Sequence, residues 1–579
     1  MKKQIDRCQK PISKELRALS LHPVLKQIYA NRDIQLAADL DCSLHSLLPY
    51  HALKDIDRAV DVLVMALQKK YRILVLGDYD VDGATSTVLA VRLLRLMGAS
   101  HVDFLVPNRF ADGYGLTSAL LEQAMTYQPN LILTVDNGIS SVEGIRLAKE
   151  RGVEVVVTDH HLASDELPDA SAIVNPNQPQ DQFASKNLAG VGVVFYLMLA
   201  LRARLREIGW FQQLELPDLN LGRFLDLVAL GTIADVVSLD HNNRILVYQG
   251  LQRIRAGSCV AGISALLKVA GRSQSTLKAS DISYAIAPRL NAAGRLESMM
   301  LAVSCLLTDD PEEALSIAKR LDQLNIDRRE IEKNMHQEAL HFIAHQLTLA
   351  DKALPHGLCL LNKAWHEGVI GILAARIKDH IQRPVIVFTE QDRDQEWLQG
   401  SARSIEGLHI RDLLDRISIQ YPHLMKRYGG HAMAAGITIH RQDFTQFSAV
   451  FNEQAKPFFD DLSRQTMALM SDGELPYTDI SIEFARLLRD AQPWGQDFSE
   501  PLFEGRFKLI RQFMIAEKHL KLVFLINGQA VDAMAFNVDA KVWPNYRCDY
   551  VHLLYRLDLN EFKNKTQLKL MVEYIEPSL

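Results

Sequence analysis

The feature that most constrains this chain is a set of short apolar runs, each ending in acidic residues. Runs this short and rich in Val, Ile and Leu are typical of strands buried in a parallel sheet. The segments between them have helical spacing, which predicts a doubly wound α/β domain. Three such runs are 71–76 before Asp78, Asp80 and Asp82, 131–135 before Asp136, and 153–157 before Asp159, His160 and His161.

The acidic residues after these runs should gather in one crevice, because ligands of open α/β sheets bind outside the carboxyl ends of the strands. Unpaired carboxylates that close together would repel one another, and a multivalent cation would remove the repulsion. Oxygen donors mixed with imidazole favour Mn²⁺ or Mg²⁺ over structural zinc. For Asp78 alone, helix capping explains the residue equally well.

Two further features extend the predicted metal site. His160 and His161 are adjacent, so in an extended loop their side chains diverge, and one can bind metal while the other faces a substrate. Asp235 follows the apolar run 230–234 at a predicted helix end and can close the metal shell from outside the sheet. By itself Asp235 would be an ordinary capping residue.

Several basic residues lie in segments that we predict to be Gly- or Ala-flanked loops: Arg109, Arg289, Arg295 and Arg403. Arginine in a tight loop suits bidentate phosphate binding, although salt bridging at the surface explains any one of them as well. Ser401 and the backbone amides of Gly429 and Gly430 could add neutral donors. The Gly-rich runs lack the GK[ST] of a P-loop, so the sequence does not indicate ATP use.

The length of 579 residues predicts three or four domains. We expect a helical segment over 1–50 and the first α/β domain over 51–305. Residues 306–352 have helical spacing and form either a connector between domains or a solvated face of the first domain. A second α/β domain is expected over 353–460. Short alternating segments over 465–579 predict a small β-barrel such as an OB-fold.

The composition narrows the class of protein. A net charge of −6 argues against a surface coated in positive charge, but it allows a local basic groove. The six cysteines are scattered without a CxxC pair, so we expect reduced thiols rather than disulfides or a zinc ribbon. The longest apolar stretch, 191–201, is too short to cross a bilayer, and no signal-peptide core follows the N-terminus. We therefore expect a cytoplasmic protein without a membrane anchor.

The motifs resemble those of the DHH phosphoesterase superfamily, which is named for the triplet found here at 159–161. Within it they are similar to the RecJ family of 5′→3′ exonucleases specific for single-stranded DNA. The segments that carry the resemblance are 77–83, 135–138, 158–161, 231–237 and 288–295, and 429–436 resembles the DHHA1 domain. The resemblance implies a doubly wound parallel-sheet DHH domain, a long helical connector, a smaller α/β DHHA1 domain and a C-terminal OB-fold β-barrel.

The resemblance also implies a two-metal centre. Two Mn²⁺ or Mg²⁺ ions would be held, with Asp136 bridging, by Asp80, Asp82, Asp136, His160 and Asp235. His161 would face the scissile phosphate and stabilise developing charge, and it forms the catalytic set with Asp136 and Asp159. Asp78 would only support the ligands.

The remaining site residues implied by the resemblance bind the DNA strand. Arg109, Ser401 and Arg403 would hold the 5′-terminal phosphate, and His431 would lie near the backbone with either Arg289 or Arg295. The OB-fold would add an electrostatic and stacking track for the single strand.

These observations predict a monomeric, two-metal exonuclease that releases 5′-mononucleotides from single-stranded DNA in recombination and repair. A single-strand-binding protein and a helicase are the expected partners. Two alternatives remain. One is a DHH phosphodiesterase for short oligoribonucleotides or cyclic dinucleotides, and the other is a replication scaffold without catalytic activity.

Overall fold

The computed structural model of the chain describes residues 3–109, 112–164, 166–350, 354–391, 394–462, 467–562 and 565–578. The domain boundaries expected at 352–353 and 465 lie outside the described residues. The chain forms two compact units. Unit 1 comprises Pro107–Gly113 and Pro288–Gln465, and unit 2 comprises Lys2–Val106, Tyr114–Ala287 and Thr466–Leu579.

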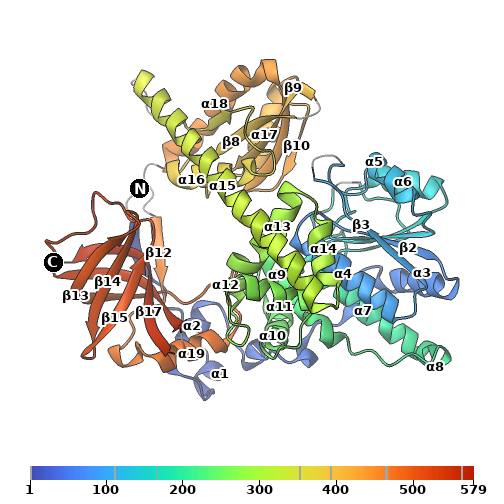
Figure 1. Ribbon diagram of the computed structural model, residues 1–579, viewed down its shortest axis with the longest axis horizontal. Helices are drawn as coiled ribbons and strands as arrows, with labels where there is room; N and C mark the ends of the chain where they lie inside the picture. Colours follow the sequence, from blue (N-terminus) through green and yellow to red (C-terminus); the bar gives the residue numbers. More distant parts are fainter. Residues whose placement is uncertain are drawn as a thin grey trace. The chain divides into compact units, whose positions relative to one another are not determined.

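Unit 2 contains a parallel five-stranded sheet with the order β3-β2-β4-β5-β6 (Figure 1). The predicted strands are confirmed to within about one residue at each end, and central β4 is buried throughout. The short strand β6 was not predicted, because three residues carry too little pattern. The bounds are β2 Arg72–Leu76, β3 His101–Leu105, β4 Leu131–Val135, β5 Glu154–Thr158 and β6 Ala172–Val174.

Helices cover both faces of this sheet, which confirms the doubly wound architecture. On one face α5 and α6 share a core with the sheet, where Leu120 and Ile145 pack with Ile132. On the other face α3, α4 and α7 contact the strands, and α9 packs on α4 and α7. The bounds are α3 Ile56–Gln68, α4 Val81–Leu96, α5 Ser118–Met125, α6 Val142–Glu150, α7 Gly190–Glu207, α9 Leu225–Ala234 and α10 His241–Arg255.

The N-terminal segment is not purely helical, which corrects the expectation for 1–50. Its helices α1 (Lys14–Ala18) and α2 (Pro23–Asn31) are preceded by strand β1 (Lys3–Arg7). Strand β1 pairs in parallel with β12 (Met467–Ser471). The partner strand lies more than 450 positions away in the sequence, so no local pattern could have revealed the pairing.

The C-terminal part of unit 2 is a closed barrel with the strand order β13-β14-β15-β17-β16, as the alternating segments predicted. Phe507, Phe524 and Leu553 are buried inside it. Helix α19 (Ile482–Ala491) packs against β16 and β17. The strands are β13 Phe503–Ile515, β14 His519–Ile526, β15 Gln529–Ala535, β16 Tyr550–Phe562 and β17 Lys565–Ser578.

Unit 1 combines the long helix α15 (Pro311–Ala350) with a mixed sheet of order β10-β11-β9-β8-β7. The long connector helix is therefore confirmed. Helix α16 (Ile370–Ile381) lies between β7 and β8 in the sequence, and α17 (Ile410–Gln420) and α18 (Phe444–Leu462) follow the strands that they cover. The strands are β7 Leu358–Leu361, β8 Val385–Gln391, β9 Asp394–Arg403, β10 Arg427–Gly430 and β11 Ala434–His440.

Two predicted loops of unit 1 are strands instead. Ser401 lies in β9, where it pairs with Val387 and Gly436, and Gly429 lies in β10. The small residues at 400–404 and 429–432 suggested loops, but in β9 and β10 ladder hydrogen bonds to neighbouring strands outweigh their low strand propensity. Arg289 and Arg295 were also predicted in loops, but both lie in helix α13 (Ala287–Leu296).

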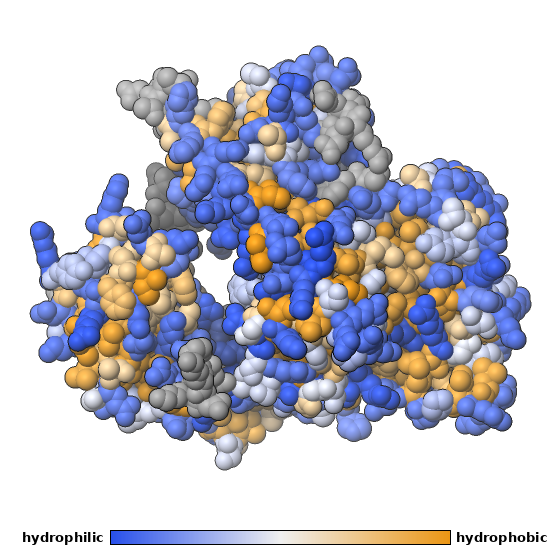
Figure 2. All heavy atoms as spheres, in the orientation of Figure 1, coloured by the Kyte–Doolittle hydropathy of each residue, from blue (hydrophilic) through white to orange (hydrophobic). Residues whose placement is uncertain are grey.

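Within the part of the chain that the structure describes, none of the helices combines the length and apolar character that crossing a bilayer requires. Apolar patches are interspersed with hydrophilic side chains on the face that Figure 2 shows.

Candidate active site

Two aspartates of the first motif lie where strand β2 gives way to helix α4. Asp80 is the N-cap of α4, and its Oδ1 accepts a hydrogen bond of 3.0 Å from the Gly83 amide. The helix begins at Val81, so the buried Asp82 lies in its first turn. This junction aims both carboxylates toward the carboxyl edge of the sheet.

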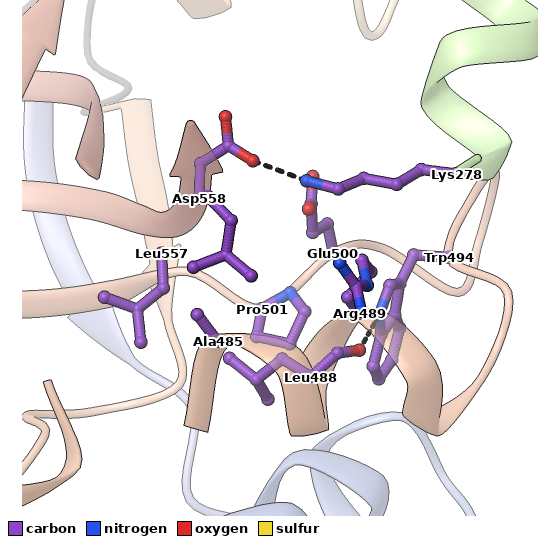
Figure 3. A pocket seen from close by; sticks show the side chains of 10 residues that line it. Lys278, Ala485, Leu488, Arg489, Trp494, Glu500, Pro501, Leu557 and Asp558 are labelled. Carbon is purple, nitrogen blue, oxygen red and sulfur yellow. Dashed lines mark hydrogen bonds and ion pairs between the residues drawn. The ribbon is translucent and has the colours of Figure 1, made fainter. Parts of the chain in front are cut away.

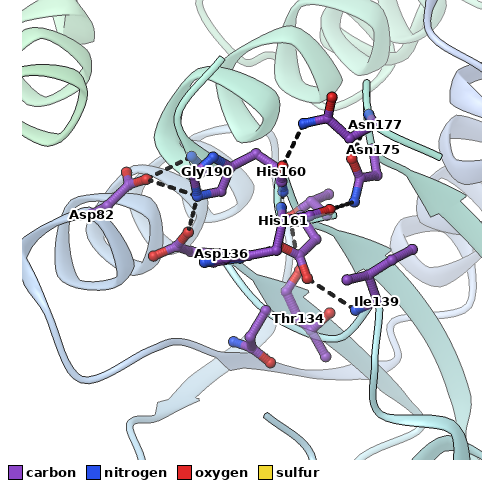
Figure 4. A network of polar contacts seen from close by, with 12 residues as sticks. Asp82, Thr134, Asp136, Ile139, His160, His161, Asn175, Asn177 and Gly190 are labelled. Carbon is purple, nitrogen blue, oxygen red and sulfur yellow. Dashed lines mark hydrogen bonds and ion pairs between the residues drawn. The ribbon is translucent and has the colours of Figure 1, made fainter. Parts of the chain in front are cut away.

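A second helix holds the Asp82 carboxylate from the opposite side. Its Oδ2 accepts a hydrogen bond of 2.6 Å from the Gly190 amide, and its Oδ1 accepts one of 2.9 Å from the Val191 amide (Figure 4). Both amides belong to the first turn of α7, where unpaired N–H groups and the helix dipole favour negative charge. Each carboxylate oxygen retains a second lone pair, so this anchoring leaves Asp82 able to bind a cation.

Asp136 occupies a strained and buried position directly after β4. Its φ of 63° is in the left-handed region, which non-glycine residues adopt at an energetic cost. Its Oδ1 is buried and accepts no hydrogen bond from the described residues. A Cβ atom at Gly190 would lie 2.5 Å from this oxygen, so glycine is needed there.

His160 brings three carboxylates together. Its Nε2 lies 3.1 Å from Asp136 Oδ1, 3.6 Å from Asp235 Oδ2 and 3.9 Å from Asp82 Oδ2. Asp235 is the C-cap of α9, which confirms its predicted place at a helix end. Ligand atoms of Asp82, His160 and Asp235 lie within 4.8 Å of one another, as do those of Asp78, Asp80 and Asp136.

Charge in this cluster is costly without a cation. Burial, followed by repulsion from Asp80, raises the pKa of Asp82 to about 7. Burial and the neighbouring carboxylates also raise the pKa of Asp136 and of Asp235 well above the usual range. The carboxylate and imidazole donors, together with the buried Asp136 Oδ1, therefore fit a hard divalent cation such as Mn²⁺ or Mg²⁺.

Asp159 has a different role, because hydrogen bonds occupy both of its oxygens. Oδ1 accepts from the backbone amides of His160 and His161 at 2.7 and 3.0 Å, and Oδ2 accepts from the Ile139 amide at 2.9 Å. Burial alone would raise its pKa, but the hydrogen bond with the His161 ring and the histidine charges hold the pKa below the usual value.

His161 is oriented by two partners. Its Nδ1 lies 2.7 Å from Asp159 Oδ1 and 2.9 Å from the Tyr114 hydroxyl. Burial lowers its pKa, but the Asp159 hydrogen bond and the surrounding carboxylates outweigh burial and raise the pKa to about 9. Tyr114 was not predicted as a site residue, although it lies between Gly113 and Gly115, which both have positive φ.

Two asparagines that were not predicted support the histidine loop (Figure 4). Asn175 Nδ2 donates to the His161 carbonyl at 2.9 Å, and Asn177 Nδ2 donates to the His160 carbonyl at 2.6 Å. Both follow the short strand β6, so they come from the same sheet edge as the predicted ligands. A prediction of β6 would have pointed to them.

A separate cluster of polar groups lies in unit 1. Arg403 Nη1 donates to Ser401 Oγ at 3.0 Å, and no carboxylate of the described residues lies within ion-pair distance of Arg403. Burial lowers the pKa of Arg403, and the positive charge of Arg109 lowers it further. A Cβ atom at Gly371 would lie 2.9 Å from Arg403 Nη2, so the first turn of α16 borders the cluster.

The other predicted strand-binding residues have structural contacts in unit 1. Arg289 Nε pairs with Asp322 Oδ1 at 2.9 Å, which ties α13 to α15. Arg295 Nη1 donates to the Gly368 carbonyl at 3.1 Å, just before α16. His431 is exposed in the turn between β10 and β11, where its amide donates to the Ala434 carbonyl.

Comparisons with known proteins show which family this chain resembles. Three protein families match the chain: the DHH family N-terminal domain at 72–232, the DHHA1 domain at 353–456 and the RecJ OB domain at 471–574. The chain is 49% identical over 559 residues to the single-stranded-DNA-specific exonuclease RecJ of Salmonella typhimurium, with 96% of each chain covered.

Solved structures agree with this likeness. The crystal structure of RecJ in complex with Mn²⁺ from Thermus thermophilus matches with a TM-score of 0.80 at 30% identity, covering 99% of this chain and 79% of that one. The Mg²⁺ complex of RecJ from the same organism matches with a TM-score of 0.74 at 29% identity, covering 99% and 78%. The chain therefore belongs to the RecJ family of single-stranded-DNA-specific exonucleases.

Proposed function

We propose that the chain is a metal-dependent exonuclease that hydrolyses single-stranded DNA from the 5′ end and releases 5′-mononucleotides. The observation that carries this proposal is the buried cluster of carboxylates and imidazole at the carboxyl edge of the unit 2 sheet. Membership of the RecJ family supports the single-stranded DNA specificity. The 5′→3′ polarity rests on the motif resemblance and on the polar cluster of Arg403, Ser401 and Arg109 in unit 1, which we call the anion site.

We assign the metal ligands to Asp80, Asp82, Asp136, His160 and Asp235, with two ions and Asp136 between them. Support for the bridge comes from the two ligand groups, because Asp136 contributes to the one with Asp78 and Asp80 and also lies beside His160. Asp78 supports the group that it forms with Asp80 and Asp136. When bound, paired divalent ions supply charge neutralisation and water activation for phosphodiester hydrolysis.

The catalytic set is His161, Asp136 and Asp159. Asp159 holds the His161 ring through Nδ1 at 2.7 Å and favours its protonated form. A protonated imidazole that is fixed in this way can donate a hydrogen bond to a phosphate oxygen and stabilise negative charge that develops there. Asp159 thus acts through His161, whereas Asp136 acts on the cations.

The anion site of unit 1 suits a terminal phosphate. Arg403 and Arg109 bring two positive charges, Ser401 adds a hydroxyl, and the first turn of α16 adds helix-terminal amides. His431 and either Arg289 or Arg295 are assigned to the backbone of the DNA strand. Arg289 pairs with Asp322, and Arg295 donates to the Gly368 carbonyl.

We propose the domain division that the sequence analysis expected, with a helical and strand-containing segment at 1–50, the DHH catalytic domain at 51–305, the connector at 306–352, the DHHA1 domain at 353–460 and the OB-fold at 465–579. In the barrel, exposed Phe513 and Phe536 with the nearby Lys521 suit a single strand, because aromatic faces stack bases and cations attract phosphates.

The proposed activity also bears on the compartment, the cellular process and the partners of the protein. We propose a cytoplasmic monomer that acts in DNA recombination and repair, where a helicase exposes single strands and a single-strand-binding protein covers them. A pull-down with each purified partner and sedimentation of the protein alone would test these assignments.

A substrate panel tests the proposed activity against its rivals. The values of kcat/KM would be measured with Mn²⁺ for long single-stranded DNA, matched duplex, short oligoribonucleotides and a cyclic dinucleotide. We expect turnover of the long single strand and none of the duplex. Preference for the oligoribonucleotide or the cyclic dinucleotide would move the protein to the phosphodiesterase class. Failure to bind Mn²⁺ in calorimetry would favour the scaffold.

A further inference from the structure

The proposed metal ligand Asp235 lies at the start of a short loop, 235–240, that joins α9 to α10 in unit 2. Its side chain is 23% exposed and lies 3.6 Å from His160 Nε2. Asp82, in the same group of ligand atoms, is buried, and two amides of α7 anchor its carboxylate. The position of the Asp235 carboxylate therefore depends more strongly on the path of its loop.

The loop is strained directly beside this ligand. Val236 follows Asp235, has a φ of 61° and is 61% exposed. A β-branched residue in the left-handed region is a genuine conformational outlier, and such strain persists only where the surrounding structure over-determines it. Relaxation of Val236 would turn the chain immediately after Asp235 and would move the carboxylate. Contacts from outside the loop must therefore hold it.

Helix α10 supplies the first of these contacts. Asn243 Nδ2 donates to the Ser238 carbonyl at 2.9 Å, and Arg244 Nη1 donates to the Leu239 carbonyl at 3.1 Å. Both side chains belong to the helix that the loop enters. They fix the end of the loop to the start of α10.

A turn in the linker between α19 and β13 holds the same loop from a distant part of the sequence. The Leu239 amide donates to the Gln496 carbonyl at 2.9 Å. Ser238 Oγ donates to Asp497 Oδ2 at 2.7 Å, across 259 positions of the chain. A Cβ atom at Gly495 would lie 2.7 Å from Leu239 Cδ1, so the backbone of the turn packs closely against the loop.

The turn 495–498 is itself well anchored. Gly495 and Phe498 pair as a β-bridge, and the buried Phe498 ring stacks on Trp494 with centroids 5.2 Å apart. The Arg244 guanidinium lies 4.3 Å from the centroid of the Phe498 ring. Trp494 Nε1 donates to the Leu488 carbonyl of α19 at 2.8 Å (Figure 3). Because α19 packs against β16 and β17, the turn links the barrel to the loop.

We propose that the turn 495–498 positions the metal ligand Asp235 through the loop 235–240, with Asp497 as the positioning residue. Asp497 acts through Ser238 and is not one of the proposed ligands. The inference rests on the ligand set assigned under the proposed function. It gives the C-terminal part of the chain a role in metal affinity, besides the strand binding proposed for the barrel.

The test measures binding of Mn²⁺ to the full chain without DNA, from the electron paramagnetic resonance signal of free Mn²⁺. Asp497→Ala and Ser238→Ala each remove the contact from one side. We expect both to weaken the binding step that Asp235→Ala abolishes by about 3- to 10-fold, less than the about 10- to 100-fold typical for a direct partner of a metal ligand. The other binding step should stay unchanged, because its ligands do not include Asp235.

Three further variants make the test specific. Asp497→Asn keeps an acceptor oxygen, and asparagine tolerates the φ of 56° at this position, so this variant should bind Mn²⁺ like the unchanged protein. Glu517→Ala removes an exposed acidic residue with a φ of 57° from the turn between β13 and β14. Lys278→Ala removes a different tie to the barrel, the contact of Lys278 with Asp558 on β16 (Figure 3). Both should leave Mn²⁺ binding unchanged.

Several results would overturn the inference. They are an unchanged Mn²⁺ affinity in Asp497→Ala, equal weakening of both binding steps, or an equal loss in Asp497→Asn. A loss of the same size in Lys278→Ala would also overturn it, because general docking of the barrel would then explain the effect. Failure of the unchanged protein to bind Mn²⁺ would instead refute the proposed ligand set, and that outcome is distinct.

Discussion

At the scale of single residues, Asp136 combines the three features that mark the candidate metal site. It is buried, its φ is in the left-handed region, and its Oδ1 accepts no hydrogen bond from the described residues. The sequence predicted the residue as a ligand because it follows a strand, but the strain was invisible there. An unfavourable conformation that persists in a rigid sheet indicates a position selected for function over stability.

The pKa shifts predict how the metal-free protein responds to pH. A carboxyl whose pKa is raised on folding binds more protons in the folded chain than in the unfolded chain. Stability is therefore lost as the pH rises from the usual carboxyl range, about 4, to the value of about 7 for Asp82. In EDTA, Tm should fall between pH 5 and pH 8. Mn²⁺ should raise Tm at pH 8 by at least about 3 °C.

The Asp136→Asn variant is the matched control for this experiment. It removes one repelling charge, so its metal-free Tm at pH 8 should exceed that of the unchanged protein. Turnover should fall by several orders of magnitude, because the variant loses the carboxylate that we propose as a ligand of both ions. A variant that is less stable than the unchanged protein in EDTA at pH 8 would contradict the view that the cluster is electrostatically strained.

Gly190 offers a second residue-scale prediction. A methyl group there would meet Asp136 Oδ1 at 2.5 Å, so Gly190→Ala should displace the carboxylate and weaken Mn²⁺ binding about 10-fold or more in calorimetry. Gly192→Ala, in the same helix, is the control, because its methyl group meets the flexible end of Leu188. Equal Mn²⁺ affinity of the two variants would show that the close approach is unimportant.

Arg403 tests the anion site. Removal of a charged hydrogen-bond donor should lower the preference for 5′-phosphate over 5′-hydroxyl substrates about 10- to 100-fold in kcat/KM. The control is Arg416→Ala, which removes an exposed arginine of α17 in the same unit. If Arg403→Ala slowed both substrates equally, the residue would not recognise the terminal phosphate.

At the scale of secondary-structure elements, the sequence predicted the strands and helices that have a local residue pattern. It missed the strands that form only because they pair with distant segments. Buried strands such as β4 carry their own signal, because five consecutive buried residues, nearly all apolar, have few other uses. The end of β9 and strand β10 were predicted as loops, because their glycines and small residues resemble turns. Strand β1 was missed because only its partner β12 makes it a strand. Asn175 and Asn177 were missed for a related reason, since their partners are backbone carbonyls that the fold brings near.

The contact between the N-terminal segment and Asp472, which directly follows β12, predicts a stability effect. Arg32 donates two hydrogen bonds to Asp472, at 2.7 and 2.9 Å, and both side chains are less than a tenth exposed. Arg32→Ala leaves a buried carboxylate without its charge partner, which costs about 3–5 kcal/mol. We expect a lower Tm and faster amide exchange in β1 and β12.

A surface ion pair provides the contrast. Arg146 pairs with Glu143 and Glu150 on α6, and all three side chains are at least half exposed. Such pairs contribute about 0–1 kcal/mol, so Arg146→Ala should change Tm little. If Arg32→Ala were as mild as Arg146→Ala, the buried pair would not hold this junction together.

At the scale of the whole molecule, chemistry and anion recognition are assigned to different units. The cluster of carboxylates and histidine that we propose as the metal site lies in unit 2 with the barrel, whereas Ser401 and Arg403 lie in unit 1. The sequence predicted both sets because the two sites depend on different residue types, carboxylates at strand ends and arginines among small residues. The sequence could not predict that 1–50 and the C-terminal segment from Thr466 belong to the unit that carries the carboxylate cluster, since that follows from long-range contacts such as Arg32 with Asp472.

The central claim is that the metal cluster drives exonuclease activity from the 5′ end of single-stranded DNA. The most direct measurement is digestion of a long single strand, labelled at either end, with Mn²⁺, beside a matched duplex and the Asp136→Ala variant. We predict immediate release of the 5′ label as a mononucleotide, an intact duplex and a silent variant. Release of the 3′ label first, or digestion by the Asp136→Ala variant at an undiminished rate, would contradict the claim.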